Sequence, residues 1–103
     1  MLIPKSPSIR SKKLRNSARD EDCTLQVVGV CNFNPETTVL AHLDSENKGT
    51  AYKSSDLFAV YACSDCHSWL DQHLGSEEDR QFYSLRALDR THRKMHSKGV
   101  IEA

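Results

Sequence analysis

Residues 57–67 read LFAVYACSDCH, and this stretch decides the fold. The apolar run before Cys63 predicts a buried strand, and the residues after it fall at helical spacing, with Cys66, Trp69 and Leu70 among them. Cys63 and Cys66 therefore lie where a strand meets the first turn of a helix. Two cysteines separated by two residues at such a junction are typical of a metal-binding finger.

A second pair of cysteines, Cys23 and Cys31, flanks a turn that contains Gly29. Zinc prefers four thiolates in a tetrahedron, and two pairs from distant parts of a chain can close such a site. We therefore predict a structural zinc ion bound by Cys23, Cys31, Cys63 and Cys66. The wide spacing of the first pair leaves open a site with fewer cysteines, and ordinary buried cysteines are the plain alternative. A redox role is disfavoured because no βαβ pattern surrounds the close pair.

The chain has 103 residues and a formal net charge of zero. A chain of this length buries too little apolar surface for a large core without a metal or disulfides. No apolar run approaches the length of a membrane span, and the first ten residues lack the apolar region of a secretory signal. We therefore expect a cytosolic protein with reduced cysteines and no membrane partner.

The hydrophobic patterning predicts the α+β class, in which a small finger carries an additional C-terminal helix. Residues 1–21 form a basic arm, mobile or docked, and ordered structure is expected to begin near Asp22. Residues 22–103 form the finger domain, including the C-terminal helix. The expected elements are strands over residues 23–28, 37–43 and 57–62, and helices over residues 64–74 and 77–95.

Basic residues gather near both ends of the chain. Arg15 and Arg19 belong to the N-terminal arm, and Lys53 lies in the polar loop before the strand; we expect these three to contact DNA phosphates, although a solvated charged surface is the plain alternative. Asp56 either assists them or fixes the loop. The further basic residues near the C-terminus are Arg86, Arg90, Arg93 and Lys94.

A family resemblance is carried by Ala41-His42-Leu43, the loop with Gly49, Lys53-Ser54-Ser55-Asp56, and Cys63-Ser64-Asp65-Cys66-His67. Together these segments resemble the HNH superfamily of ββα-metal endonucleases. More narrowly, the chain from about Ser11 to Ile101 is similar to the YbcO-type nucleases of lambdoid prophages. The resemblance implies a treble-clef zinc finger, a DNA substrate, and a role beside phage recombination proteins.

The same resemblance implies roles for individual residues. His42 takes the position of the general base, and His67 that of a ligand to a catalytic Mg²⁺, Mn²⁺ or other divalent ion. Asp71 shares a helix face with His67 and supplies a second ligand, since Ala41 stands where the family has its first. His73 lies on a different helix face, and we expect it to be exposed to solvent.

Two other functions fit the sequence. The first is a zinc-finger module that binds nucleic acid or protein without catalysis, which the loss of a ligand at Ala41 favours. The second is an accessory protein that binds a phage partner through an apolar stripe on the last helix, although such a stripe is more often core. A response to added divalent metal discriminates the nuclease from both. The stripe comprises Phe82, Tyr83, Leu85 and Leu88.

Overall fold

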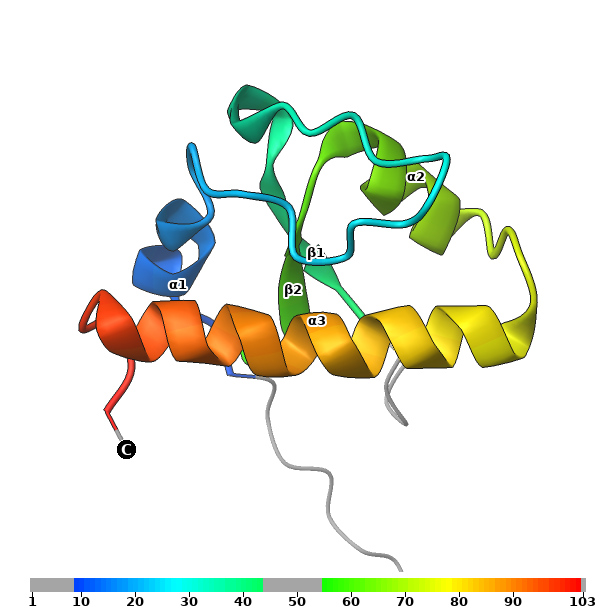
Figure 1. The fold of residues 1–103 in the computed structure, drawn as a ribbon. Helices are drawn as coiled ribbons and strands as arrows, with labels where there is room; N and C mark the ends of the chain where they lie inside the picture. The colour runs from blue at the N-terminus through cyan, green and yellow to red at the C-terminus, as the bar shows by residue number, and fades with distance from the viewer. Residues whose placement is uncertain (1–8, 44–54, 103) are drawn as a thin grey trace, which may run out of the picture.

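The computed structural model describes residues 9–43 and 55–102. Its helices and its two-stranded sheet confirm the α+β class. Figure 1 shows α3 running along one side of the molecule, with α1, the sheet and α2 grouped on the other side. Within the described ranges, no helix has the length and apolar character needed to cross a bilayer. The elements are α1 (Lys12–Ser17), a 3₁₀ turn (Pro35–Thr37), β1 (Val39–His42), β2 (Ala59–Ala62), α2 (Ser64–Asp71) and α3 (Glu77–Ser97).

The antiparallel sheet separates two apolar clusters. β1 and β2 pair Ala41 with Val60 and Leu40 with Tyr61. Because side chains alternate between the faces of a sheet, the first pair and the second pair face opposite ways. Ala41 and Val60 pack with the cysteines and Trp69, whereas Leu40 and Tyr61 pack with residues of α1 and α3. His42, one residue after Ala41, shares the face of Leu40 and Tyr61.

The long helix α3 covers the outer edge of β2. The backbone N–H of Tyr61 donates to the Thr91 hydroxyl at 3.0 Å, and the Tyr61 carbonyl accepts from the backbone N–H and the hydroxyl of Thr24, both at 2.8 Å. Thr91 is fully buried. An open strand edge exposes unpaired backbone groups, so these polar contacts replace the third strand that the sheet lacks.

The two helices after the close cysteine pair are confirmed at nearly the predicted bounds. Cys63 caps α2 by accepting from the backbone N–H of Cys66, and Ser76 caps α3 by accepting from that of Asp79. The guanidinium of Arg80 then donates to the carbonyls of residues 73–75, between the helices. This arginine fixes the linker that joins α2 to α3.

The predicted strand over residues 23–28 is wrong. The alternation that suggested it holds only in part, since Leu25 and Val27 are buried and Gln26 and Val28 are exposed, but Thr24 is buried as well. Gln26, however, has a φ of 47°, which breaks an extended conformation, and its N–H donates to the Cys23 sulfur at 3.5 Å. The segment therefore wraps around the sulfurs as a loop.

The start of ordered structure near Asp22 is also wrong, because α1 precedes it. Ser11 caps this helix by accepting from the N–H of Leu14. Leu14 is 4% exposed and packs in the cluster of Tyr61 and Met95. Lys98 near the C-terminus donates to the Ser17 carbonyl at 2.6 Å. Two buried apolar residues, Leu14 and Ala18, and these polar contacts dock this N-terminal segment on the rest of the fold.

Candidate metal centre and groove

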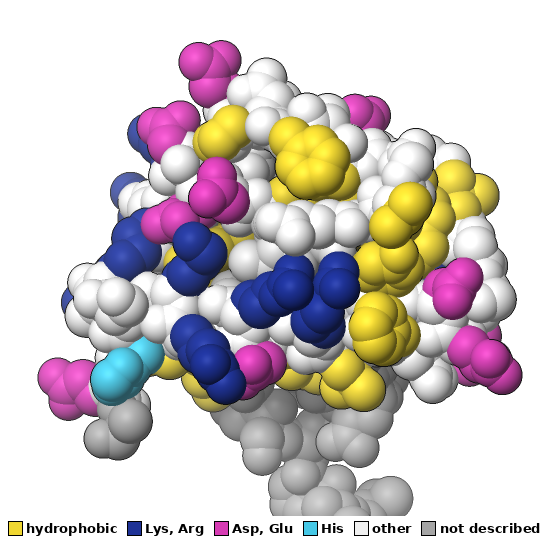
Figure 2. Space-filling model, in the orientation of Figure 1, with side chains coloured by type: hydrophobic (Ala, Val, Ile, Leu, Met, Phe, Trp, Pro, Cys, Tyr) yellow, Lys and Arg dark blue, Asp and Glu magenta, His cyan; other side chains and the backbone are white. Residues whose placement is uncertain are grey.

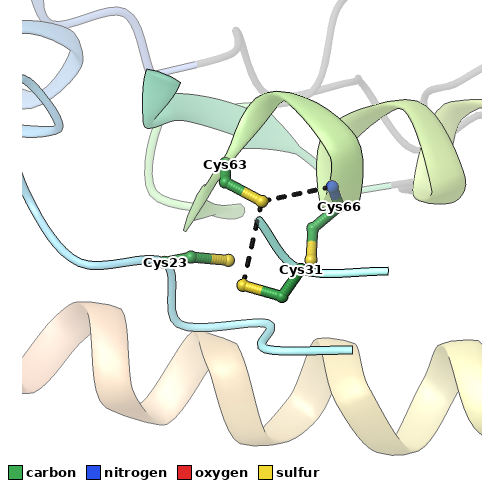
Figure 3. Close-up of side chains that lie close together, drawn as sticks. All are labelled: Cys23, Cys31, Cys63 and Cys66. Atoms are coloured by element: carbon green, nitrogen blue, oxygen red, sulfur yellow. Dashed lines mark hydrogen bonds between the residues drawn. The ribbon is translucent and has the colours of Figure 1, made fainter. Parts of the chain in front are cut away.

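Four cysteines from distant parts of the chain converge on one point (Figure 3). Cys63 and Cys66 come from the start of α2, and Cys23 and Cys31 come from the loop before the sheet. Their sulfur atoms all lie within 4.8 Å of one another, and those of Cys31 and Cys63 are 3.9 Å apart. A tetrahedral ion with metal–sulfur bonds of about 2.3 Å separates its ligands by roughly 3.8 Å. The cluster can therefore hold a metal ion such as zinc.

The electrostatics of the cluster favour a bound cation. Hydrogen bonding with Cys66 lowers the pKa of Cys23 to about 5, whereas burial raises the pKa of Cys31 to about 11. The same hydrogen bond to Cys23, together with burial, raises the pKa of Cys66. Without a metal, the Cys23 thiolate is thus stabilised by hydrogen bonds from neighbouring protonated thiols. A divalent cation can replace those protons, because thiolates are the ligand form of cysteine.

Two arginines of α3 contact the loop that carries Cys23. Arg86 donates to the carbonyl of Leu25, and Arg90 donates to that of Thr24, so both hold the loop that carries Cys23. Figure 2 shows Lys and Arg side chains gathered over the middle of α3, with hydrophobic side chains on one side of them. Arg86 also lies 5.3 Å from the ring centre of Phe82. Buttressing the loop is therefore a role of these arginines that the charge pattern alone did not indicate.

His42 ends β1 with its ring against a buried carboxylate. His42 Nε2 and Asp56 Oδ1 are 2.7 Å apart, and the Asp56 side chain is fully buried. The other oxygen, Oδ2, accepts from the backbone N–H of Ser11 at 2.6 Å and from the Arg15 guanidinium at 2.7 Å. Burial alone would raise the pKa of Asp56, but hydrogen bonds from Ser11, His42 and Arg15 outweigh it and lower the pKa. Asp56 is therefore ionised at neutral pH.

His67 and Asp71 lie on one face of α2, as predicted, with His67 Nε2 3.2 Å from an Asp71 oxygen. Asp71 also lines a groove of about 470 Å³ between the sheet and α3. His42 and His73 lie among the residues that line it, with the apolar side chains of Leu43 and Phe58. The groove thus brings together the end of β1 and the end of α2. Its lining residue His42 makes its hydrogen bond with Asp56.

The family model described as "Putative nuclease YbcO" matches residues 12–100. The chain belongs to the YbcO family. A relative from Escherichia coli K12, described as "Putative nuclease YbcO", is 40% identical over 93 residues, which cover 87% of this chain and 97% of the relative. A relative from Enterobacteria phage 82 with the same description has the same identity and coverage.

One solved structure has a fold similar to that of this YbcO-family chain. It is titled as that of a putative bacteriophage protein from Escherichia coli K-12, and it is 37% identical to this chain. The TM-score is 0.71, and the match covers 84% of this chain and all of the other. The nuclease description and the phage origin belong to those relatives.

The structure adds contacts of three site residues of this YbcO-family chain that the sequence did not indicate. Asp56 was weighed as a loop or phosphate residue, and its contact with His42 had no sequence signal beyond its place at the start of the predicted strand. His73 is exposed, as predicted, but lines the groove because it follows the end of α2 with a φ of 54°. Arg15 binds Asp56. Lys53 lies outside the described residues.

Replacing Asp56 with alanine should destabilise the fold by about 3 kcal/mol at pH 7, because the donors of Ser11 and Arg15 lose a buried acceptor. The pKa of Asp56 is lower when folded, so this stabilisation is complete above the unfolded value of about 3.9 and is lost as pH falls through the folded value. Urea unfolding of the metal-loaded protein measures the change.

The control for this substitution is Asp89→Ala. Asp89 is 64% exposed and pairs with Arg93 on the surface of α3, so its loss should cost less than about 0.5 kcal/mol. Equal stabilities of the Asp56→Ala and Asp89→Ala proteins would contradict a structural role for the buried carboxylate.

Proposed function

We propose that this chain is a metal-dependent endonuclease that hydrolyses DNA phosphodiester bonds. The observation that carries the proposal is the groove that His42 and Asp71 both line, in a fold that also carries a four-cysteine cluster able to hold a metal ion. The nuclease description of relatives 40% identical to this chain supports it. We include in the proposal that β1, β2 and α2 form a treble-clef finger of the HNH type around a structural zinc ion.

Hydrolysis of a phosphodiester needs a base for the attacking water and positive charge for the phosphate. In this proposal His42 accepts the proton of the water. His67 and Asp71 hold a Mg²⁺, Mn²⁺ or other divalent ion, and their adjacent ring nitrogen and carboxylate are a suitable donor set. Such an ion, when bound, stabilises the charge that develops on the phosphate and on the leaving oxygen.

The DNA backbone is held, in this proposal, by basic residues on the side of the sheet that faces α1. Arg19 is exposed, and it lines a shallow hollow beside β1 together with Arg15. Arg15 uses its Nη1 atom on Asp56, while 40% of its side chain stays exposed to solvent. Lys53, which lies outside the described residues, is proposed as a further phosphate contact. We further propose that the protein acts in the cytoplasm, in phage recombination or DNA processing.

One observation favours a binding module without catalysis. Ala41, which stands at the first metal-ligand position of the HNH resemblance, is fully buried opposite Val60 in the cysteine-side cluster. That backbone position faces the core, so the groove receives no ligand from it. The apolar stripe on α3 is only partly core. Tyr83 and Leu88 pack against the core, whereas Phe82 and Leu85 are exposed.

A metal titration tests the proposal. Zinc-loaded protein should nick supercoiled plasmid when Mg²⁺, Mn²⁺ or Ni²⁺ is added, and Asp71→Asn should raise the metal concentration for half-maximal nicking at least about tenfold. Asp89→Asn is the matched control, because Asp89, like Asp71, forms an exposed pair with a residue four positions away in its helix. Salt-sensitive plasmid binding without nicking under any metal would replace the nuclease with the binding module.

A further inference from the structure

One side chain links the described residues before Cys23 to the end of β1. Asp56 lies between them, with Oδ1 facing His42 and Oδ2 facing the backbone N–H of Ser11 and the guanidinium of Arg15. The backbone N–H of Asp56 donates to the Ile9 carbonyl at 2.7 Å, and the Ile9 N–H donates to the Ser55 hydroxyl at 2.9 Å. The N-terminal segment therefore holds Asp56 through its backbone and its carboxylate.

We propose that Asp56 determines which ring nitrogen of His42 acts as the base, with α1 and its cap holding Asp56 in place. An ionised carboxylate only accepts hydrogen bonds, so the ring nitrogen that faces it, Nε2, carries the proton. The other ring nitrogen, Nδ1, then has a free lone pair while His42 is neutral. Asp56 is a positioning residue here, and this inference rests on the proposed nuclease function.

This arrangement determines the path of the proton in the reaction. Nδ1 of His42 takes a proton from water as the water oxygen forms a bond to phosphorus. The bond from phosphorus to the leaving ester oxygen breaks, and that oxygen takes a proton from solvent. The imidazolium that forms carries one positive charge, and the Asp56 carboxylate 2.7 Å away stabilises it. The segment before Cys23 thereby belongs to the reaction centre, in addition to any contact with DNA.

Asp56→Asn tests this with almost no change of shape. An amide has one acceptor oxygen, and both donors on the N-terminal side, the Ser11 N–H and Arg15, require it. The amide NH₂ must then face His42, so Nε2 becomes the acceptor and the proton moves to Nδ1. The substitution should therefore invert the tautomer, and DNA nicking should fall by about 10²–10⁴-fold.

Nitrogen-15 NMR of the zinc-loaded protein reads the tautomer without any need for activity, because protonated and bare ring nitrogens resonate far apart. His92 is the internal control, since its Nε2 lies 2.8 Å from the Leu57 carbonyl, which only accepts. Its spectrum should be the same in both proteins. Arg15→Ala is the second control, because it keeps the carboxylate and should keep the native tautomer.

The outcomes separate this inference from the proposed function. A native Nε2–H tautomer that inverts in Asp56→Asn, together with the loss of nicking, supports both. If the native protein nicks DNA but Asp56→Asn leaves either the His42 tautomer or the nicking rate unchanged, the inference is overturned. The proposed nuclease function then stands without it. An inverted tautomer in a protein that nicks no DNA with any metal overturns the nuclease, and the role of His42 as a base fails with it.

Discussion

Replacing Cys66 with serine, or removing the metal with a strong chelator, is expected to unfold most of the domain. A structural zinc ion contributes about 10–16 kcal/mol of apparent binding free energy, whereas the net stability of a domain is about 5–15 kcal/mol. The centre joins the loop of Cys23 and Cys31 to the start of α2, and it lies within the larger apolar cluster. The binding free energy lost with the ion is therefore expected to exceed the net stability of the folded domain.

Fluorescence of Trp69 measures this unfolding directly. Trp69 is the one tryptophan of the chain, it is 7% exposed, and its ring centre lies 5.8 Å from that of Tyr83 on α3. Its emission should shift to the red on chelation and return when zinc is added. Val28→Ser is the matched control, since Val28 lies in the same loop but is 85% exposed and should change stability by less than about 0.5 kcal/mol.

The metal content distinguishes the possible ligand sets. A folded Cys66→Ser protein that retains one zinc per chain would show that three or fewer cysteines suffice. Cys31→Ser is informative in the same measurement, because Cys31 is the one partly exposed member of the cluster. If both variants fold with zinc bound, the four-cysteine assignment fails.

Replacing His42 with glutamine should lower the rate of DNA nicking by about 10²–10⁴-fold at saturating metal. This range is the usual contribution of a general base, and it equals about 3–5 kcal/mol of transition-state free energy. Glutamine keeps an amide N–H that can donate to Asp56, so the buried carboxylate retains a partner. The loss of rate then reports the missing base and not an unfolded protein.

Single-turnover nicking of supercoiled plasmid measures the effect, with Trp69 emission as the check on folding. His96→Gln is the control, because His96 lies exposed in the last turn of α3, away from the groove. Its rate should stay within about threefold of the native rate. A native rate in the His42→Gln protein would assign the base to another group, and His73 would be the first to test, since it lines the same groove.

The strands and helices around Cys63 could be predicted because each has a strong local signal. The apolar run up to Ala62 gives β2, and Ser76 with three acidic residues after it gives the start of α3. The strand over residues 23–28 failed for a non-local reason. Leu25 and Val27 are buried because they pack in the cluster that contains the start of α2, and the positive φ of Gln26 between them interrupts the extended backbone.

The candidate site was predictable only in part. The face shared by His67 and Asp71 follows from helical spacing, so it was confirmed. The partner of His42 does not follow from spacing, although the hairpin register places Ala59 opposite His42 and therefore Asp56 near the same end. Helix α1 escaped prediction because one buried leucine is a weak pattern, and its main contacts are hydrogen bonds to residues more than 40 positions away.

The closure of the β2 edge by Thr91 sets an order for biosynthesis. Among the described elements α3 follows β2 and α2 in the chain, so the strand edge stays open until Thr91 has been made. During that interval the edge can pair with the same strand of another nascent copy, which is the usual origin of swapped or aggregated chains. A chain that stops before residue 91 therefore carries a hazard that a chain with α3 does not.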